Sequence, residues 1–164
     1  MDDTLSFLYA AATGNIAALE KSYFNNKSIL TARNPDGRTA LHLAAFHQQP
    51  EVLELLLSYG MCPSSTDTRG QTALHIAAQG SSTDAVGILL KNGAGCSTRD
   101  KDGKKAIFYA YQNPITEILA RFLEFAPTCG VGCSLTPEVV LRASPSDEVV
   151  PCCGPALSER TVVK

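Results

Sequence analysis

One stretch decides the fold of this 164-residue chain: Asp36-Gly37-Arg38-Thr39-Ala40-Leu41-His42-Leu43-Ala44-Ala45. It recurs 33 residues later as Arg69-Gly70-Gln71-Thr72-Ala73-Leu74-His75-Ile76-Ala77-Ala78. A more divergent copy follows after a further 33 residues, as Asp102-Gly103-Lys104-Lys105-Ala106-Ile107-Phe108-Tyr109-Ala110-Tyr111. A fixed period of this length indicates stacked structural repeats, because each unit buries its apolar face only against its neighbours.

Each copy predicts a pair of short helices. In the second unit, Thr39 is placed to cap a helix that begins at Ala40, since a threonine hydroxyl satisfies a backbone group left unpaired at a helix start. Pro50 suits the first position of the next helix, where its missing N–H costs nothing, and Gly60 ends that helix. Upstream, Asn34-Pro35-Asp36-Gly37 has the composition of a tight turn, so we expect a hairpin before the pair.

The segment Thr39-Ala40-Leu41-His42-Leu43-Ala44 resembles the Thr-Pro-Leu-His-x-Ala motif of the ankyrin-repeat family, and the resemblance extends over roughly residues 3–126. It implies an all-α repeat solenoid, made of stacked helix-turn-helix units with β-hairpin connectors. We expect about four units, including divergent caps at both ends: residues 3–33, 34–66, 67–99 and 100–126.

The outermost units are expected to form the ends of the stack. The position of Leu55 and Ile88 in the middle units is occupied by Lys21 in the first unit and by Arg121 in the last. A covered cation without a partner is costly, so both side chains are expected to face water. This agrees with the polar outer face that terminal repeats require.

The last 38 residues have a different composition. Residues 127–164 contain five prolines and four of the six cysteines, with no repeat register. This predicts a Pro- and Cys-rich tail that is largely disordered or forms one short helix. Adjacent Cys152 and Cys153 do not easily chelate one tetrahedral zinc ion, and we expect the cysteines of the chain to be reduced thiols.

Composition and charge argue against several classes of function. A net charge of −2 gives no global reason to expect nucleic acid or an anionic membrane as a partner. No apolar run approaches the ~20 residues of a membrane helix. The acidic start lacks the basic and apolar regions of a secretory signal. We therefore expect a monomer in the cytoplasm, the nucleus or both.

His42 and His75 are the obvious candidates for a reactive or metal-binding pair, but both stand in the repeat motif. The family resemblance assigns them to hydrogen bonds that brace neighbouring hairpins. No Gly-rich phosphate loop, Ser/His/Asp arrangement or carboxylate pair stands outside the repeats. We expect no catalytic residue, no metal site and no cofactor. His47 faces the concave side, where partner contact and plain solvent exposure both remain open.

Positions that vary between units, while the framework stays constant, are free to carry specificity. In the ankyrin family, hairpin tips and first helices form one extended surface that recruits other proteins. The resemblance therefore predicts partner-binding residues at the tips and on the concave face: Arg33, Pro35, Asp36, Arg38, Thr68, Arg69, Gln71, Arg99, Lys101, Asp102 and Lys104, then Phe46, His47, Gln79, Gln112 and Asn113.

The hairpins contain seven basic and four acidic side chains, whereas the remaining residues contain seven basic and twelve acidic ones. Two interpretations stay open: a solvated loop face, or a docking surface for an acidic patch of a protein partner. We expect a non-enzymatic adaptor or inhibitor. The alternative is a substrate-recruiting adaptor of a ubiquitin ligase, because the tail around Ser134 and Leu135 faintly resembles an elongin-binding box.

Overall fold

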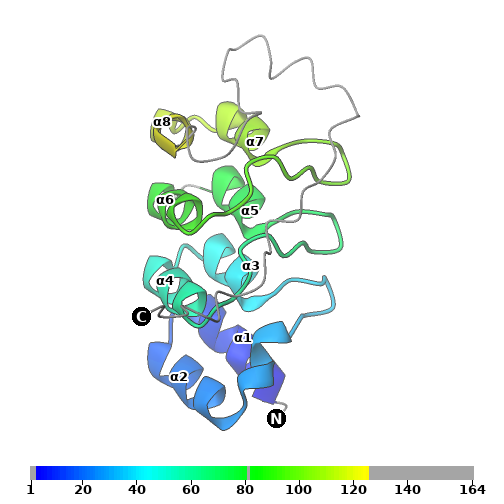
Figure 1. Ribbon diagram of the computed structural model, residues 1–164, viewed down its shortest axis with the longest axis vertical. Coiled ribbons are helices and arrows are strands. Elements are labelled where there is room, and N and C mark those ends of the chain that lie inside the picture. The colour runs from blue at the N-terminus through cyan, green and yellow to red at the C-terminus, as the bar shows by residue number, and fades with distance from the viewer. Residues whose placement is uncertain (1–2, 81, 126–164) are drawn as a thin grey trace, which may run out of the picture.

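The computed structural model describes residues 3–80 and 82–125, which form pairs of helices stacked in one column (Figure 1). The α-helices are α1 (Asp3–Thr13), α2 (Ile16–Asn25), α3 (Ala40–Phe46), α4 (Pro50–Ser58), α5 (Ala73–Gln79), α6 (Thr83–Lys91), α7 (Ala106–Gln112) and α8 (Thr116–Phe125), with a 3-10 helix, η1 (Lys27–Thr31), after α2. This is the all-α repeat solenoid that the resemblance to the ankyrin motif implies.

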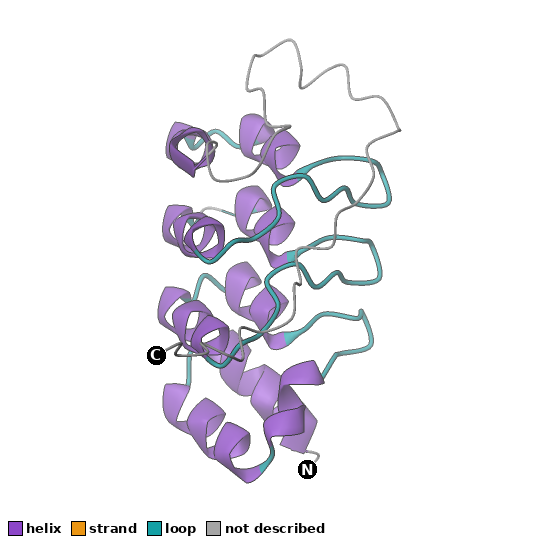
Figure 2. Ribbon diagram, viewed as in Figure 1, coloured by secondary structure: helices purple, strands orange, loops and turns teal. Residues whose placement is uncertain are grey.

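The helices form two layers. An inner layer contains α1, α3, α5 and α7, and an outer layer contains α2, α4, α6 and α8 (Figure 1). The loops that connect successive pairs project on the side away from the outer layer (Figure 2). Single antiparallel bridges join Thr66 to Thr72 and Arg99 to Lys105 at the base of two of these loops. The connectors therefore follow the course of a β-hairpin, but their strand pairing is limited to single bridges.

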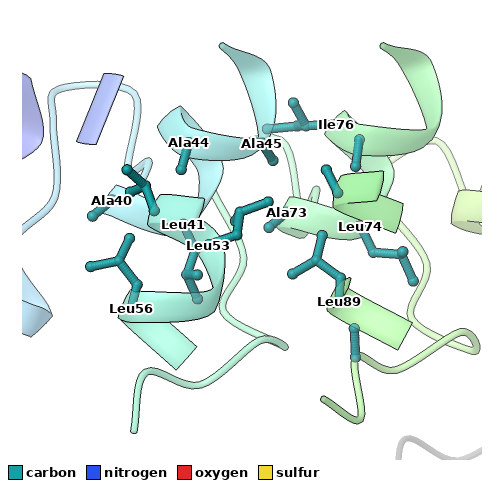
Figure 3. Close-up of a cluster of buried hydrophobic side chains, with 14 of the residues drawn as sticks. Ala40, Leu41, Ala44, Ala45, Leu53, Leu56, Ala73, Leu74, Ile76 and Leu89 are labelled. Atoms are coloured by element: carbon teal, nitrogen blue, oxygen red, sulfur yellow. The ribbon is translucent and has the colours of Figure 1, made fainter. Parts of the chain in front are cut away.

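Small side chains let neighbouring helices approach closely in the core (Figure 3). Six alanines of the motif are each at most 1% exposed: Ala40, Ala44, Ala45, Ala73, Ala77 and Ala78. Because an alanine side chain is a single methyl group, two backbones can pack against each other without a gap. Leu41 and Leu74 are buried to the same degree and supply the larger apolar volume of each unit.

The helix ends lie where capping residues predict them. Thr39 and Thr72 cap α3 and α5, each in a capping box with the histidine three residues further on. Lys105 stands at the equivalent position of α7 and makes no side-chain capping bond. Gly60 and Gly93 follow α4 and α6 with φ angles of +85° and +79°, a region that glycine tolerates best.

The basic side chains at the stacking position of the two end units are exposed to solvent. Lys21 of α2 and Arg121 of α8 are exposed, whereas the equivalent Leu55 and Ile88 of the middle units are partly buried against the core. The prediction for both cations is confirmed. The stack can therefore end at these units without burying a charge.

Cys62 and Cys96 are disulfide-bonded in the structure, so the expectation of reduced thiols is wrong for these two residues. Cys62 lies just after Gly60, which ends α4, and Cys96 lies just after Gly93, which ends α6. The predictions for the tail, residues 127–164, lie outside the described residues. None of the helices described is long and apolar enough to span a membrane.

Candidate protein-interaction face

Three side chains shape the hairpins from the inside. The Oδ1 atom of Asp67 accepts hydrogen bonds from the backbone N–H groups two and four residues ahead, at 2.8 and 2.9 Å. Asp100 repeats this arrangement at 3.0 and 2.9 Å. Asn34 accepts from the N–H four residues ahead at 2.8 Å. These residues are spaced by 33, so the same polar contact folds each hairpin.

Neighbouring hairpins are joined through their backbones. The N–H of Thr68 donates to the carbonyl oxygen of Asp36, and the N–H of Lys101 donates to that of Arg69, both at 3.0 Å. Gly37, with φ +73°, permits the approach, because a Cβ there would lie 3.1 Å from the backbone nitrogen of Thr68. The tips form one continuous structure, here called the hairpin ridge: residues 33–38, 66–71 and 99–104.

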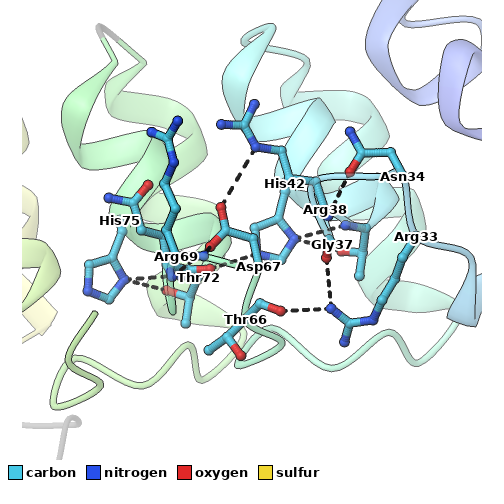
Figure 4. Close-up of polar contacts among 12 residues, drawn as sticks. Arg33, Asn34, Gly37, Arg38, His42, Thr66, Asp67, Arg69, Thr72 and His75 are labelled. Carbon is cyan, nitrogen blue, oxygen red and sulfur yellow. Dashed lines mark hydrogen bonds and ion pairs between the residues drawn. The ribbon is translucent and has the colours of Figure 1, made fainter. Parts of the chain in front are cut away.

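Arg33 is directed at the backbone of the ridge (Figure 4). Its Nη1 donates to the carbonyl oxygen of Gly37 at 2.8 Å and to that of Thr66, in the next hairpin, at 2.7 Å. Arg99 makes the first of these contacts in its own hairpin, donating to the carbonyl oxygen of Gly103 at 2.8 Å. These two predicted tip residues therefore also stiffen the ridge.

His42 and His75 brace successive hairpins, and this prediction is confirmed. The Nε2 atom of His42 lies 3.0 Å from the carbonyl oxygen of Gln71, and that of His75 lies 3.2 Å from the carbonyl oxygen of Lys104. Because a carbonyl only accepts, each ring carries a proton on Nε2 and leaves Nδ1 to accept from the threonine cap. Burial lowers the pKa of both imidazoles, which favours the neutral ring.

Two acidic side chains of the ridge, Asp67 and Asp100, are buried and bind backbone N–H groups. In the part of the chain that the structure describes, no group of three or more His, Cys, Asp or Glu side chains is arranged to hold a metal ion. The chemistry that the ridge offers to a ligand is therefore hydrogen bonding, charge and aromatic contact.

Phe46, at the end of α3, presents an aromatic ring to solvent beside the ridge, with 56% of its surface exposed. The guanidinium carbon of Arg38 lies 5.6 Å from the centroid of this ring, and the Arg38 Nε lies 3.7 Å from Oδ2 of buried Asp67. The ring of His47 packs edge-on against Phe46 at 5.1 Å. Arg38 therefore connects the ridge to the inner helices by neutralising Asp67 and covering one side of Phe46.

A second basic and aromatic cluster lies in the last unit. The Nζ atom of Lys104 is 5.1 Å from the ring centroid of Phe108 and 5.8 Å from that of Tyr109. The Tyr109 hydroxyl donates to Oδ2 of Asp100 at 2.6 Å. Burial and this hydrogen bond raise the pKa of Tyr109 to about 12. Burial alone would raise the pKa of Asp100, but the hydrogen bonds that it accepts outweigh burial and lower it.

Most of the predicted partner-binding residues are accessible. Those that are exposed are Arg33, Pro35, Asp36, Phe46, His47, Thr68, Arg69, Gln79, Lys101, Asp102 and Gln112. Those that are partly buried are Arg38, Arg99, Lys104 and Asn113. The ridge and the exposed ends of the inner helices lie side by side and form what we call the interaction face.

Gln71 does not lie at the surface as the sequence predicts. It is only 8% exposed, because its N–H donates to Asp67 and its carbonyl oxygen accepts from His42. Asn113 also serves the scaffold, since its Nδ2 donates to the carbonyl oxygen of Gly80 at 2.6 Å. We therefore remove Gln71 from the interaction face and assign Asn113 mainly to the contact between units.

Asp67 and Asp100 are the buried carboxylates of the ridge, a role that was not predicted from the sequence. A signal was present, because each of the three hairpins has an asparagine or aspartate three residues before its glycine. The contact of Tyr109 with Asp100 has no such signal. It depends on how α7 is oriented relative to the preceding hairpin, which the repeat pattern does not specify.

Comparisons with known proteins agree with this architecture. The family model for ankyrin repeats, in its three-copy form, matches residues 3–67 and 62–127. No curated protein matches the chain significantly. Ankyrin repeats are typically non-enzymatic and generally bind other proteins. Since the model matches well over half of the sequence, and the structure shows the stacked helix pairs, the chain belongs to the ankyrin-repeat family.

Proposed function

We propose that this protein is a monomeric adaptor or inhibitor that binds an acidic segment of a protein partner on its interaction face. The observation that carries the proposal is the unequal burial of charge on the hairpin ridge. Two of its acidic residues, Asp67 and Asp100, are only 8% and 7% exposed and bind backbone N–H groups. The basic residues of the ridge remain closer to the surface.

The charge that the ridge presents to solvent is consequently more positive than the net charge of all its residues. Arg33, Arg69 and Lys101 are exposed, and Arg38 and Lys104 are partly exposed, while Asp36 and Asp102 are the exposed acids. An acidic partner would be attracted over several ångströms before contact, which raises the rate of association. The proposal therefore makes a kinetic prediction as well as an affinity prediction.

Phe46 supplies the apolar anchor that a charged surface lacks. Interfaces owe most of their affinity to a few aromatic and arginine residues in covered positions. Phe46 and Arg38 are such a pair, already in contact in the free protein. A partner segment with an aliphatic or aromatic side chain beside its carboxylates would complete the cover of the Phe46 ring.

The test uses the variant Arg69→Glu/Lys101→Glu, since neither side chain makes a polar contact within residues 3–80 and 82–125 and the fold should be retained. Its probes are synthetic peptides rich in Asp and Glu with one central Leu, measured by surface plasmon resonance at low and high salt. We expect slower association and a weaker salt dependence. Phe46→Ala should accelerate dissociation by about tenfold.

The matched control is Lys21→Glu, which makes one charge reversal on the exposed side of α2, away from the ridge. It should leave association unchanged. If Arg69→Glu/Lys101→Glu associates as fast as the wild type, or if Lys21→Glu slows association equally, the ridge does not attract the partner.

A further inference from the structure

Helices α7 and α8 form one end of the column of units (Figure 1). Tyr111 of α7 is 64% exposed at this end, and Leu123 of α8 is 51% exposed. Ile107 and Leu119 lie one turn before them, on the same side of each helix, and are partly exposed. These four apolar residues are here called the end face.

The positions of the end face are covered in the middle units. The residues 33 positions earlier, in the third unit, are each at most 4% exposed: Leu74, Ala78, Val86 and Leu90. They are covered because α7 packs on α5 and α8 packs on α6. The end face is therefore the surface on which a further unit would pack. Its four side chains are apolar, unlike the polar outer face that a terminal repeat requires.

The first unit shows which positions of an inner helix face the preceding unit. Ser6 and Tyr9 of α1 are exposed, and the described residues contain no unit before α1. The equivalent residues of the next two units are buried or partly buried: Ala40 and Ala73 for Ser6, then Leu43 and Ile76 for Tyr9. The first and fourth positions of α3 and of α5 are therefore covered by the unit before them.

A sequence in the tail has the features of an inner helix. Thr136 and Pro137 are suited to a helix cap and the first helical position, and Pro145 would end that helix by residue 144. The predicted helix, residues 137–143, has seven residues, as do α3, α5 and α7. A threonine also stands directly before α3 and α5.

One side of the predicted helix is apolar. When Thr136 is aligned with the threonine caps of α3 and α5, Pro137 occupies the first position, Val140 the fourth and Leu141 the fifth. Residues with this spacing share one side of a helix. The first and fourth positions are those that face the preceding unit in the stack, so the apolar side of the segment matches the side on which an inner helix packs backwards.

The opposite side of the predicted helix is charged. In the same alignment, Glu138 and Arg142 occupy the second and sixth positions, which are those of Ile107 and Tyr111 in α7. The middle units bury these two positions under the unit that follows. A helix with charges there can face water and end a stack, which is the arrangement that α7 itself lacks.

We propose that residues 137–143 form a helix that packs on the end face and caps the stack, with Val140 and Leu141 against Ile107 and Tyr111. The chain itself supplies this occupant, because residues 126–135 connect the end of α8 to Thr136. Ten extended residues reach up to ~33 Å, whereas packed helices lie about 8–10 Å apart. Tethering also gives the segment an effective concentration on the order of millimolar, so a small apolar contact is sufficient.

The experiment measures hydrogen exchange by mass spectrometry on the full chain, with a synthetic peptide of residues 130–150 as the unprotected reference. The amides from Val140 to Ala143 should exchange at least about tenfold more slowly in the protein than in the peptide, because a helix pairs them internally. Tyr111→Glu should return them to the rate of the peptide. Tyr111 is exposed on α7, so α1–α8 should stay folded in this variant, which circular dichroism checks.

Two further variants test the tail side of the contact. Val140→Asp/Leu141→Asp should release the segment as Tyr111→Glu does. Glu138→Leu/Arg142→Leu should keep the protection, because these positions face away from the stack. It should also make the protein self-associate with rising concentration, since it places an apolar surface at the end of the column.

The matched control is Phe24→Glu, which changes an exposed aromatic residue on α2, at the other end of the column (Figure 1). It should leave the exchange of the tail unchanged. Sedimentation should show a monomeric wild type; a dimer that Tyr111→Glu dissociates would assign the end face to a second copy and overturn the proposal. It is also overturned if the wild-type segment exchanges as fast as the peptide, or if Tyr111→Glu leaves it protected.

Discussion

The Nε2 atom of His42 lies 3.0 Å from the carbonyl oxygen of Gln71, a residue 29 positions further along the chain. The other ring nitrogen accepts the backbone N–H of Thr39 at 3.1 Å. One neutral imidazole therefore connects the start of its own helix to the hairpin of the next unit. His75 repeats the connection one unit later, whereas the fourth unit has Phe108 at this position.

Replacement of His42 by alanine should destabilise the protein by about 2 kcal/mol or more, because the Thr39 N–H and the Gln71 carbonyl then lose a buried partner at about 1–3 kcal/mol each. Urea unfolding followed by circular dichroism measures this loss. His47→Ala is the matched control, since His47 is exposed and should change the free energy of unfolding by less than about 0.5 kcal/mol. Equal effects of the two substitutions would contradict the bracing role.

Stability should decrease as the pH falls below about 6.5. Burial lowers the pKa of His42 and His75 below the ordinary value of 6.5, so the unfolded chain binds more protons than the folded one just below that pH. Each histidine then costs about 1.4 kcal/mol per pH unit until its folded pKa is reached. Unfolding free energies measured between neutral pH and pH 5 should fall accordingly. A flat profile in this range would show that the rings do not titrate as described.

Removal of the Tyr109 hydroxyl should destabilise the last hairpin. Tyr109→Phe deletes the donor 2.6 Å from Oδ2 of Asp100, and a hydrogen bond to a charged group contributes about 1.5–3 kcal/mol. We expect the lower end, because Tyr109 is only partly buried. The pKa of Asp100 is lowered, so its stabilising contribution is present above the ordinary value of 3.8 and is lost as the pH falls through the folded pKa.

The difference between wild type and Tyr109→Phe should therefore shrink when urea unfolding is repeated at increasingly acidic pH. Tyr111→Phe provides the control, since Tyr111 is 64% exposed and should behave as the wild type at every pH. A constant difference from neutral to strongly acidic pH would mean that the stabilising contribution of ionised Asp100 does not depend on the hydroxyl of Tyr109.

Residue type and spacing in the repeated motif were sufficient to predict the stack and the caps, whereas the bracing role of the histidines was predicted from the resemblance to the ankyrin motif. A threonine directly before such a helix caps it, as Thr39 does, and alanine permits close packing of helices in any unit. Gln71 could not be predicted in the same way. It varies between units like a surface residue, yet the bonds with Asp67 and His42 hold it inside the ridge.

Phe46 and Arg38 show how much of the candidate site could be predicted from the sequence. The sequence indicated that both are free to vary and close to the surface. Their mutual contact, and the ion pair that ties Arg38 to Asp67, depend on the stagger between one hairpin and the next helix. Which side chains meet between units depends on how far each unit is rotated relative to the next, and the 33-residue period does not give this rotation.

Replacement of Gln48 by glycine should stabilise the protein. It is the one non-glycine residue with positive φ in the described ranges, at +56°, and it follows Phe46 and His47 in the turn between α3 and α4. Gly14 occupies the equivalent turn of the first unit with φ +76°. The left-handed region costs a side-chain-bearing residue about 1–2 kcal/mol, and the added freedom of the unfolded glycine offsets about 0.4–1 kcal/mol of the gain. Gln48→Gly should therefore raise the free energy of unfolding by up to about 1 kcal/mol in urea, and Gly14→Ala should lower it. A destabilised Gln48→Gly would mean that the glutamine side chain makes a contribution larger than the strain of its backbone.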